Sequence, residues 1–445
     1  MHRVRIFLSI TSVLISGIQV QAQSWSALPN APISSGRHED VVFLNQQLGW
    51  VVNVHGEIHK TRDGGESWIL QIEAEQELGF SVVFRSVGFA NEQVGWVGNL
   101  NFTNSPRPGR ALFETRNGGE SWTNITDRVT GPEPVGVCGI WVVNEQLVYA
   151  VGRWNGPAIF IKSTDGGISW TSQDLSPLVT GAVDVFFFNA DTGLVVGGNG
   201  VGSSFEEQRS SKSVILLTTD GGESWEPRYT SETLGKWCWK ISFPTPDTGY
   251  VATQGPTPDG VVLKTTDGGL TWTEQVVASG EGFSGIGFAT SRLGWVGGGT
   301  VYETRDGGAT WQEAPHVGER INRFRMLSDT LGYAVGRTVY KYSEANPVSV
   351  SPTVPEIPNQ FTLQQNYPNP FNPATTIRYE VEKSGRVVLQ VFNLTGQMVR
   401  TLVDAHKAPG IYEVSLDASN LPTGVYLYRL RSGNFRTSRK MILMK

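Results

Sequence analysis

Thr61-Arg-Asp-Gly-Gly-Glu-Ser-Trp68 is the first of six near-identical octets in this chain of 445 residues. Every octet has Ser or Thr first, Asp or Asn third, Gly-Gly next, Ser or Thr seventh and Trp last. The other five are residues 115–122, 163–170, 218–225, 265–272 and 304–311. Their tryptophans lie 39 to 55 residues apart, which is the length of one four-stranded blade of a β-propeller.

Each octet is predicted to form a tight turn between two strands. Glycine adopts the positive φ that such turns need, the third side chain accepts backbone N–H groups, and the tryptophan packs between sheets. Equally spaced carboxylates would also suit catalysis or calcium binding, but turns in different blades lie far apart, so we prefer a structural role. The residues assigned this role are Asp63, Trp68, Asn117, Trp122, Asp165, Trp170, Asp220, Trp225, Asp267, Trp272, Asp306 and Trp311.

A second repeat counts the blades. Seven segments about 45 residues apart resemble Leu48-Gly-Trp50-Val51, and each follows a run of alternating apolar residues, which is typical of a strand with one packing face. Seven inner hairpins therefore accompany six octets, while Gln23-Ser-Trp25 resembles the end of a missing seventh octet. We predict a seven-bladed propeller over residues 23–345 whose N-terminal strand completes the last blade, because closure removes exposed sheet edges.

The remaining segments differ from the propeller in composition. Residues 1–22 carry Arg3 and Arg5, an apolar run and then Val20-Gln-Ala22, which predicts a signal peptide cleaved after Ala22. No later segment is long and apolar enough to predict a transmembrane span in the mature chain. Residues 346–360 form a Pro-rich linker, and alternating strands predict a small immunoglobulin-like β-sandwich over 361–445. The predicted fold class is therefore all-β.

Charge and cysteine content exclude several functions. Residues 23–345 carry 23 Lys and Arg against 35 Asp and Glu, whereas residues 346–445 carry 11 against 6. An acidic propeller is a poor partner for nucleic acid. Cys138 and Cys238 are expected in different blades, where two thiols are favoured over a disulfide. Gly56 separates His55 from His59, and no P-loop or zinc spacing occurs, so we expect no metal and no cofactor.

The motifs resemble two known families. The octets resemble the Asp-box (BNR) repeats, and with the inner-strand pattern they are similar to photosystem II assembly and stability factors over most of 23–345. This resemblance implies a seven-bladed propeller that binds a partner protein. Asp-box propellers also occur in sialidases, xyloglucanases and sortilin-type receptors, so the motif is specific for the fold and not for the function.

The last 85 residues resemble the type IX secretion C-terminal sorting domain. The resemblance implies passage of the inner membrane by the signal peptide, passage of the outer membrane by the type IX secretion machinery, and display on or release from the surface of a Gram-negative bacterium. The positions that carry the sorting motifs are Tyr367, Pro368, Asn369, Pro370, Gly424, Tyr426, Arg439 and Lys440.

A partner is expected at the mouth of the central channel. The loops between second and third strands are long in blades two to five, at 99–110, 153–158, 197–213 and 254–260, and long loops on a rigid scaffold are typical of binding sites. Trp154 and Trp239 are expected to be exposed aromatics that anchor an interface or stack on sugars. The alternative for the charged residues at the mouth is that they are ordinary solvated surface charges. The candidate ligand-binding residues are Arg37, Arg85, Trp154, Asp184, Trp239, Lys240, Asn322 and Arg323.

These features favour a secreted, surface-attached and non-enzymatic propeller that binds a protein or a polysaccharide. A photosystem role is not expected to transfer, because the sorting domain directs the chain outward. The alternative is an extracellular glycoside hydrolase or sialidase-like enzyme, for which two facing carboxylates at the mouth would suffice. The sequence has no Arg-Ile-Pro start motif of sialidases and no Gly-x-Ser-x-Gly elbow, and we assign no catalytic residue.

Overall fold

The computed structural model describes residues 23–444 except 75–81, 102–108, 201–203, 257–258, 281, 345–360, 367–368, 370, 372 and 434. The chain divides into two compact units, residues 1–347 and 348–445. Strands in nine sheets dominate the described part, which also contains the short helix α2 (Phe205–Ser210) and the 3-10 turns η1 (Thr126–Arg128) and η2 (Pro315–Val317). The predicted signal peptide and linker lie outside the described residues.

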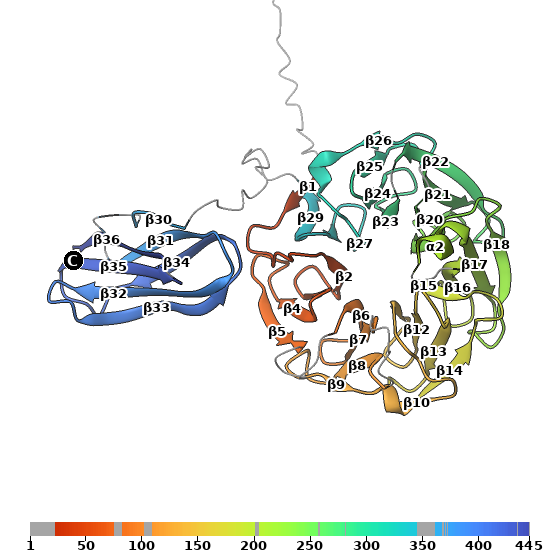
Figure 1. Cartoon of the computed structure of the whole chain (residues 1–445), viewed down its shortest axis with the longest axis horizontal. Coiled ribbons are helices and arrows are strands. Elements are labelled where there is room, and N and C mark those ends of the chain that lie inside the picture. Colours follow the sequence, from red (N-terminus) through yellow and green to blue (C-terminus); the bar gives the residue numbers. More distant parts are fainter. Residues whose placement is uncertain are drawn as a thin grey trace, which may run out of the picture. The chain divides into compact units, whose positions relative to one another are not determined.

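The first unit is a seven-bladed β-propeller, as predicted (Figure 1). In each blade the strands follow one another outward from the central channel. The first three blades contain β2 (His38–Phe43), β3 (Gly49–Asn53), β4 (Glu57–Thr61) and β5 (Ile69–Glu73); β6 (Phe84–Phe89), β7 (Gly95–Asn99), β8 (Leu112–Thr115) and β9 (Thr123–Asn124); and β11 (Gly139–Val142), β12 (Val148–Gly152), β13 (Ile159–Ser163) and β14 (Trp170–Asp174). Strand β10 (Val129–Thr130) adds a parallel fifth strand to the third blade, beside β14.

The other four blades continue the same pattern around the ring. They contain β15 (Gly181–Phe187), β16 (Gly193–Asn199), β17 (Lys212–Thr218) and β18 (Glu226–Thr230); β19 (Trp237–Ser242), β20 (Gly249–Gln254), β21 (Asp259–Thr265) and β22 (Thr273–Ser279); β23 (Phe283–Phe288), β24 (Gly294–Gly298), β25 (Val301–Thr304) and β26 (Gln312–Glu313); and β27 (Arg323–Met326), β28 (Gly332–Val335), β29 (Val339–Glu344) and β1 (Gln23–Ala27).

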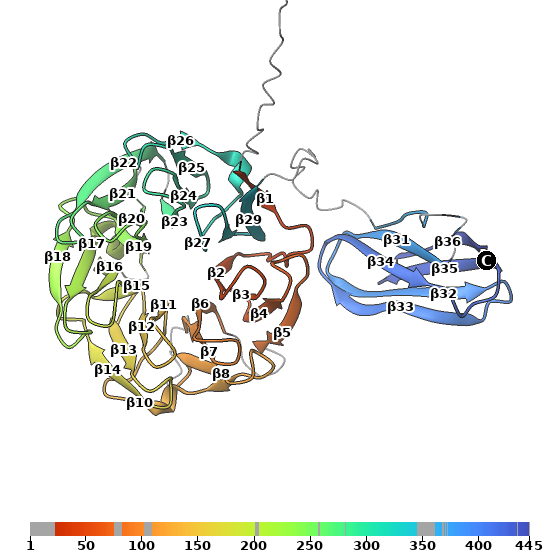
Figure 2. The same ribbon diagram turned by 180° about the vertical axis from the view of Figure 1, so that it is seen from behind.

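The N-terminal strand closes the ring. β1 pairs antiparallel with β29, with Trp25 opposite Tyr342, and the two strands lie side by side in Figures 1 and 2. Trp25 is buried, and its ring centroid lies 5.2 Å from that of Trp295 in the sixth blade and 5.5 Å from that of Phe324. The prediction that this strand completes the seventh blade is confirmed.

Side-chain hydrogen bonds hold the octet turns. In the first octet, the Asp63 carboxylate accepts from the backbone N–H of Ser67 at 2.9 Å and from the hydroxyl of Thr61 at 2.8 Å. Gly64 and Gly65 have φ of 72° and 96°, which a side chain at either position would strain. The bond from the Ser67 hydroxyl is the largest cause that lowers the pKa of Asp63 to about 2. The carboxylate is therefore fully engaged in its own turn.

The two sequence repeats contact each other across blade boundaries. Tyr333 of the seventh blade stacks on Phe43 of the first blade at 3.6 Å and donates its hydroxyl to the carbonyl of Gly64 at 3.0 Å. Trp68 lies edge-on to the same Phe43 at 6.2 Å. The same arrangement recurs between the fifth and sixth blades, where Tyr250 is the equivalent of Tyr333. Each inner phenylalanine therefore lies between an aromatic ring of the preceding blade and the octet tryptophan of its own blade.

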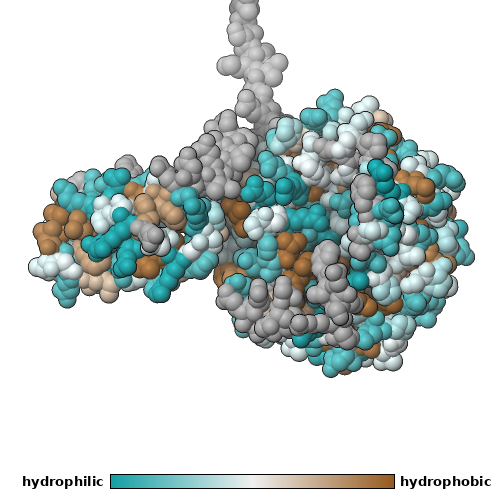
Figure 3. Space-filling view, viewed as in Figure 1, coloured by the Kyte–Doolittle hydropathy of each residue, from teal (hydrophilic) through white to brown (hydrophobic). Residues whose placement is uncertain are grey.

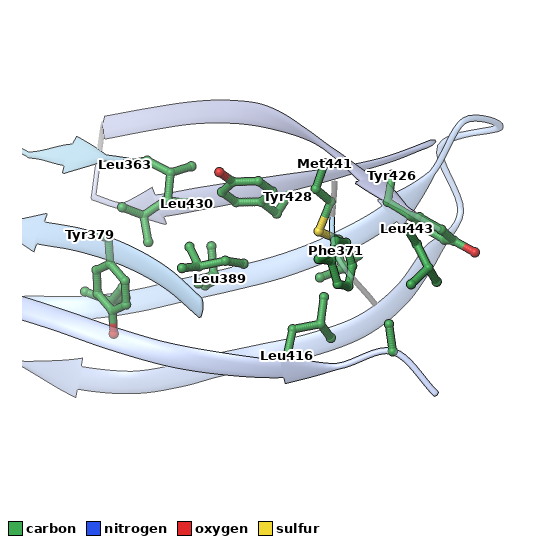
Figure 4. Close-up of a cluster of buried hydrophobic side chains, with 14 of the residues drawn as sticks. Leu363, Phe371, Tyr379, Leu389, Leu416, Tyr426, Tyr428, Leu430, Met441 and Leu443 are labelled. Carbon is green, nitrogen blue, oxygen red and sulfur yellow. The ribbon is translucent and has the colours of Figure 1, made fainter. Parts of the chain in front are cut away.

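The second unit is a β-sandwich of two sheets. One sheet has the order β30 (Thr362–Leu363), β31 (Ala374–Val381) and β34 (Gly410–Asp417); the other has the order β33 (Met398–Lys407), β32 (Gly385–Asn393), β35 (Gly424–Ser432) and β36 (Phe435–Leu443). Figure 4 shows side chains from both sheets, among them Tyr379, Leu389, Leu416 and Leu430, meeting in one buried cluster. The unit therefore has a core of its own.

Candidate ligand-binding site at the channel mouth

A recurrent β-bulge determines which side chains face the channel. The pairing of the innermost strand with its neighbour skips one residue in five blades, at Glu39, Arg85, Val183, Trp239 and Ser284. Such a bulge sets two residues of one strand opposite a single residue of its partner and redirects their side chains. The side chains of two consecutive residues of one inner strand can therefore both point toward the channel. The inner strands of these blades therefore carry two successive rings of side chains.

A pocket of about 240 Å³ opens where these strands begin. Its walls come from the starts of inner strands and from the ends of second strands, so it lies on the face where the sequence predicted the partner. The blades that contribute are the first, second, third and fifth. We call it the mouth pocket; its lining residues are Arg37, Glu39, Val54, Val83, Arg85, Leu100, Trp154, Trp237, Trp239 and Gln254.

Glu39 is the centre of the polar network in the mouth pocket. One carboxylate oxygen accepts from Nε of Arg37 at 2.6 Å, and the other forms an ion pair with Nη1 of Arg85. The amide of Asn322 also donates to this second oxygen at 3.0 Å, and Trp239 donates its indole N–H to Asn322 at 3.0 Å. Glu39 is 1 % exposed, so this network holds a charged group that water barely reaches.

Arg85 lines the mouth pocket and has two buried guanidinium nitrogens without a hydrogen-bond partner in the described part of the chain, and its guanidinium also lies beside the thiol of Cys138. Its guanidinium lies 4.5 Å from the ring centroid of Trp239, and the residue is 2 % exposed. Among the described residues, Nε and Nη2 of Arg85 have no hydrogen-bond partner, and neither has the indole N–H of Trp237. The Nε–Nη2 edge is the side of a guanidinium that binds carboxylate or phosphate with two parallel hydrogen bonds. The residues that line the pocket therefore include buried donors without an acceptor among the described residues.

Two indoles form the apolar wall. Trp154, from the loop after β12, and Trp237, at the start of β19, lie with their ring centroids 6.0 Å apart and their planes 28° apart. Trp154 is partly exposed, whereas Trp237 and Trp239 are buried. Their contact is possible because the third and fifth blades both reach the mouth. The wall suits an apolar or planar group next to the donors of Arg85.

A cluster of buried charges lies one residue deeper along the inner strands. We call it the channel floor; it consists of Asp40, Asp184, Lys240 and Arg323. Arg323 donates to Asp40 at 2.9 Å and to both oxygens of Asp184 at 2.8 and 2.9 Å, and so it connects the seventh blade to the first and fourth. Burial alone would raise the pKa of Asp184, but the charge of Arg323 outweighs it and holds this pKa at about 2.

Lys240 is the unusual member of the channel floor. Its Nζ is fully buried, lies 3.8 Å from a carboxylate oxygen of Asp184, and has no hydrogen-bond partner among the described residues. Burial lowers the pKa of Lys240 to about 7, because the interior disfavours the ammonium form. The charge of the floor therefore changes near neutral pH.

The eight predicted ligand-binding residues separate into two groups. Arg37, Arg85, Trp154 and Trp239 line the mouth pocket, whereas Asn322 and the three residues Asp184, Lys240 and Arg323 of the floor support it from below. The expectation that Trp239 is exposed is wrong, because the bulge turns this ring into the channel, where it is 5 % exposed. The alternative of ordinary solvated charges is also wrong for the buried members of this set, which form ion pairs or pack on aromatic rings inside the protein.

Sequence reasoning missed Glu39 and Trp237. Glu39 follows Arg37 by two residues and precedes the alternating apolar run, so the pattern marked it as a strand start without a role. Its function depends on Arg85 of the next blade and Asn322 of the last, which no local pattern connects. The sequence Trp237-Cys-Trp239 is itself a signal, because it places two tryptophans at the start of the inner strand β19, whereas no other inner strand that the structure describes begins with a tryptophan.

The sorting-motif residues that the structure describes lie in or beside the last strands of the second unit. Asn369 accepts from the backbone of Ile442 at 2.8 Å, and Tyr426 donates its hydroxyl to Pro422 at 2.7 Å. Arg439 donates to the carbonyl of Leu363, Lys440 is exposed on β36, and Gly424 begins β35. Tyr367, Pro368 and Pro370 lie outside the described residues.

Three other predictions concern cysteines, metals and membranes. Cys138 and Cys238 are separate, buried thiols. Within the described ranges, no group of three His, Cys, Asp or Glu side chains is placed to hold a metal ion. No helix in the part of the chain that the structure describes could cross a membrane. The face in Figure 3 is mainly hydrophilic, with its hydrophobic residues in separate patches.

Two family models match parts of this chain. Residues 18–140 match the family model of the photosynthesis system II assembly factor YCF48, and residues 365–444 match the secretion system C-terminal sorting domain. A search of curated proteins found no match to this sequence.

Two solved structures are similar to the propeller. YCF48 bound to D1 peptide has a TM-score of 0.53 and 19 % identity, over 73 % of this chain and 99 % of that chain. YCF48 from Cyanidioschyzon merolae has a TM-score of 0.53 and 19 % identity, over 72 % of this chain and 98 % of that chain. At this identity the likeness establishes the fold alone. The protein is thus a secreted β-propeller similar to the photosystem II assembly factor YCF48, followed in the chain by a secretion system C-terminal sorting domain.

Proposed function

We propose that this protein is a non-enzymatic binding protein of the cell exterior whose mouth pocket holds an acidic segment of a partner polypeptide. The observation that carries the proposal is the unpartnered Nε–Nη2 edge of Arg85. A buried guanidinium with two free donors on one edge is costly until a planar anion accepts from both. The carboxylate of an aspartate, a glutamate or a chain end has this geometry.

The rest of the pocket suits a peptide better than an isolated anion. Trp154 and Trp237 form an apolar wall beside Arg85, and the free indole N–H of Trp237 can donate to a peptide carbonyl. YCF48, which has the same fold, is known in a complex with a D1 peptide. Indoles also stack on sugar rings, so a polysaccharide is the competing ligand that the experiment must separate.

The carboxylates of the site argue against hydrolysis. A glycosidase needs two carboxyl groups free to act on one bond, one as acid and one as base or nucleophile. Glu39 is the acidic residue that lines the mouth pocket, and it is engaged by Arg37, Arg85 and Asn322. Asp40 and Asp184 are buried and held by Arg323. A site whose acids are all ion-paired in this way favours binding over catalysis.

We also propose a route by which the protein reaches the cell exterior. The sorting domain at 365–444 and the predicted signal peptide support passage through the type IX secretion machinery of a Gram-negative bacterium, followed by surface attachment. The partner would then be an extracellular or surface polypeptide, and a photosystem subunit is not implied.

The full chain should be screened on an array of acidic and neutral peptides beside an array of glycans. We expect hits among peptides with an acidic residue next to an apolar one, and loss of these hits in Arg85→Gln and Trp154→Ala. Arg116→Gln is the matched control, because Arg116 pairs with Glu114 outside the pocket. Hits confined to glycans would assign a polysaccharide instead. Peptide hits that survive Arg85→Gln, or release of sugar from a glycan, would refute the proposal.

A further inference from the structure

We propose that Glu39 makes the mouth pocket selective for a singly charged acidic group, a carboxylate, over a doubly charged one such as a phosphorylated side chain. The inference rests on the proposed function and concerns the same pocket. It assigns to Glu39 the role of a specificity-determining residue, because its own negative charge fixes how much positive charge remains for the ligand.

The charges of the mouth pocket leave one positive charge uncompensated. Arg37 and Arg85 are the two cationic residues of its lining, and Glu39 is the anionic one. Each carboxylate oxygen of Glu39 faces a different arginine, so the pair of cations shares one internal anion. A ligand carboxylate on the free edge of Arg85 would bring the pocket to neutrality. A phosphate ester carries nearly two negative charges at neutral pH and would leave the pocket with an excess negative charge.

The channel floor does not change this balance. Asp40 and Asp184 face Arg323 and Lys240, and Arg325 also lies 3.8 Å from Asp40, so these five residues carry one positive charge when Lys240 is protonated and are neutral when it is not. Burial lowers the pKa of Lys240 to about 7, so at pH 7.5 most of the Lys240 side chains are neutral and the floor adds no net charge below the ligand. Because the site is buried, an excess negative charge there is screened less than at the surface.

Glu39 cannot easily leave its place when a ligand enters. Asn322 donates to the backbone carbonyl of Glu39 at 2.6 Å and to its side chain at 3.0 Å, and Trp239 holds Asn322 in turn. Glu39 also lies on the bulge of β2, where the backbone fixes its direction. A second ligand charge therefore cannot be accommodated by turning Glu39 out into solvent.

The test compares two pentapeptides that differ only at the central residue, glutamate in one and phosphoserine in the other. Their affinities for the full chain are measured at pH 7.5 by isothermal titration calorimetry. We expect the wild-type protein to bind the glutamate peptide roughly tenfold or more tightly than the phosphoserine peptide. In E39Q, which keeps the shape but removes the charge, both peptides should bind more tightly and the preference should disappear or reverse.

The matched control is E114Q. Glu114 is also a buried glutamate shared by two arginines, Arg116 at 2.7 Å and Arg128 at 2.8 Å, but it lies outside the mouth pocket. This variant should keep the wild-type preference. If E39Q fails to fold, the wild-type protein decides the question by pH. Between pH 7.5 and 5.5 the phosphoserine becomes singly charged, and its affinity should rise roughly tenfold relative to the glutamate peptide.

The outcomes separate this inference from the proposed function. Two results would show that Glu39 does not set the selectivity: a wild-type protein that prefers the phosphoserine peptide, or an E39Q variant with the wild-type ratio of the two affinities. In either case the binding function stands if Arg85→Gln abolishes binding of both peptides. If neither peptide binds the wild-type protein or E39Q, both proposals fail. An unchanged ratio between pH 7.5 and 5.5 also overturns the role of Glu39.

Discussion

Truncation of Trp25 to alanine should destabilise the whole propeller, although Trp25 is only the third residue of the predicted mature chain. Trp25 is 5 % exposed and contacts the rings of Trp295, Phe324 and Tyr342 with centroids 5.2 to 5.5 Å away. Replacing a buried tryptophan by alanine costs roughly 3–5 kcal/mol. A propeller of this size has an unfolding entropy of roughly 0.7 kcal/mol/K, so Tm should fall by about 6 °C.

Two variants in the same strand test the reasoning. Ser26→Ala changes an exposed neighbour in β1 and should shift Tm by less than about 1 °C. Trp25→Phe keeps an aromatic ring and removes an indole N–H that has no hydrogen-bond partner among the described residues, so it should cost much less than the alanine. Tm of the propeller transition is measured by circular dichroism on the full chain. If Trp25→Ala melts within a degree or two of Ser26→Ala, β1 does not close the ring energetically.

Three further predictions follow from the structure. Asp63→Ala should lower stability by roughly 1 kcal/mol, seen as a lower urea midpoint, and leave peptide affinity unchanged; a folded variant that loses binding would move this carboxylate into the site. The folded-state pKa of Lys240, about 7, lies below its ordinary 10.5, so the unfolded chain holds a proton that the folded chain lacks and stability should rise with pH across this window. Lys240→Met should abolish that rise in Tm between pH 7 and 9.5, whereas Lys212→Met should keep it. If Tm rises equally with pH in the wild-type protein and in both variants, the burial of the Lys240 ammonium group is contradicted. A chain ending at Ala345 should keep the Tm of the propeller but remain in the periplasm of the native host, and its normal surface display, seen by cell fractionation, would refute the sorting role.

Much of the architecture is local and was therefore predictable. The octets and the inner-strand pattern each describe one hairpin, because glycine φ values and side-chain alternation depend on neighbours in sequence. The inner-strand pattern occurs seven times and the octet only six times, so one blade lacks its outer strand and Trp25 is the end of an octet without a blade. Closure of the seventh blade by β1 follows from this difference. The bulge was not predicted, since it appears only in the pairing of two strands. It is the bulge that turns Trp239 inward.

The site itself depended on tertiary structure. Sequence alone determined the propeller, its closure, the sorting tail and the face on which charged and aromatic residues gather. It could not determine that Glu39 meets Arg85 and Asn322, because these residues come from the first, second and seventh blades and are brought together only when the ring closes. Nor could it distinguish the lining of the mouth pocket from the channel floor, since the two groups are adjacent in sequence. Burial and pairing, which convert ordinary surface charges into a site with one unused guanidinium edge, exist only in the folded ring.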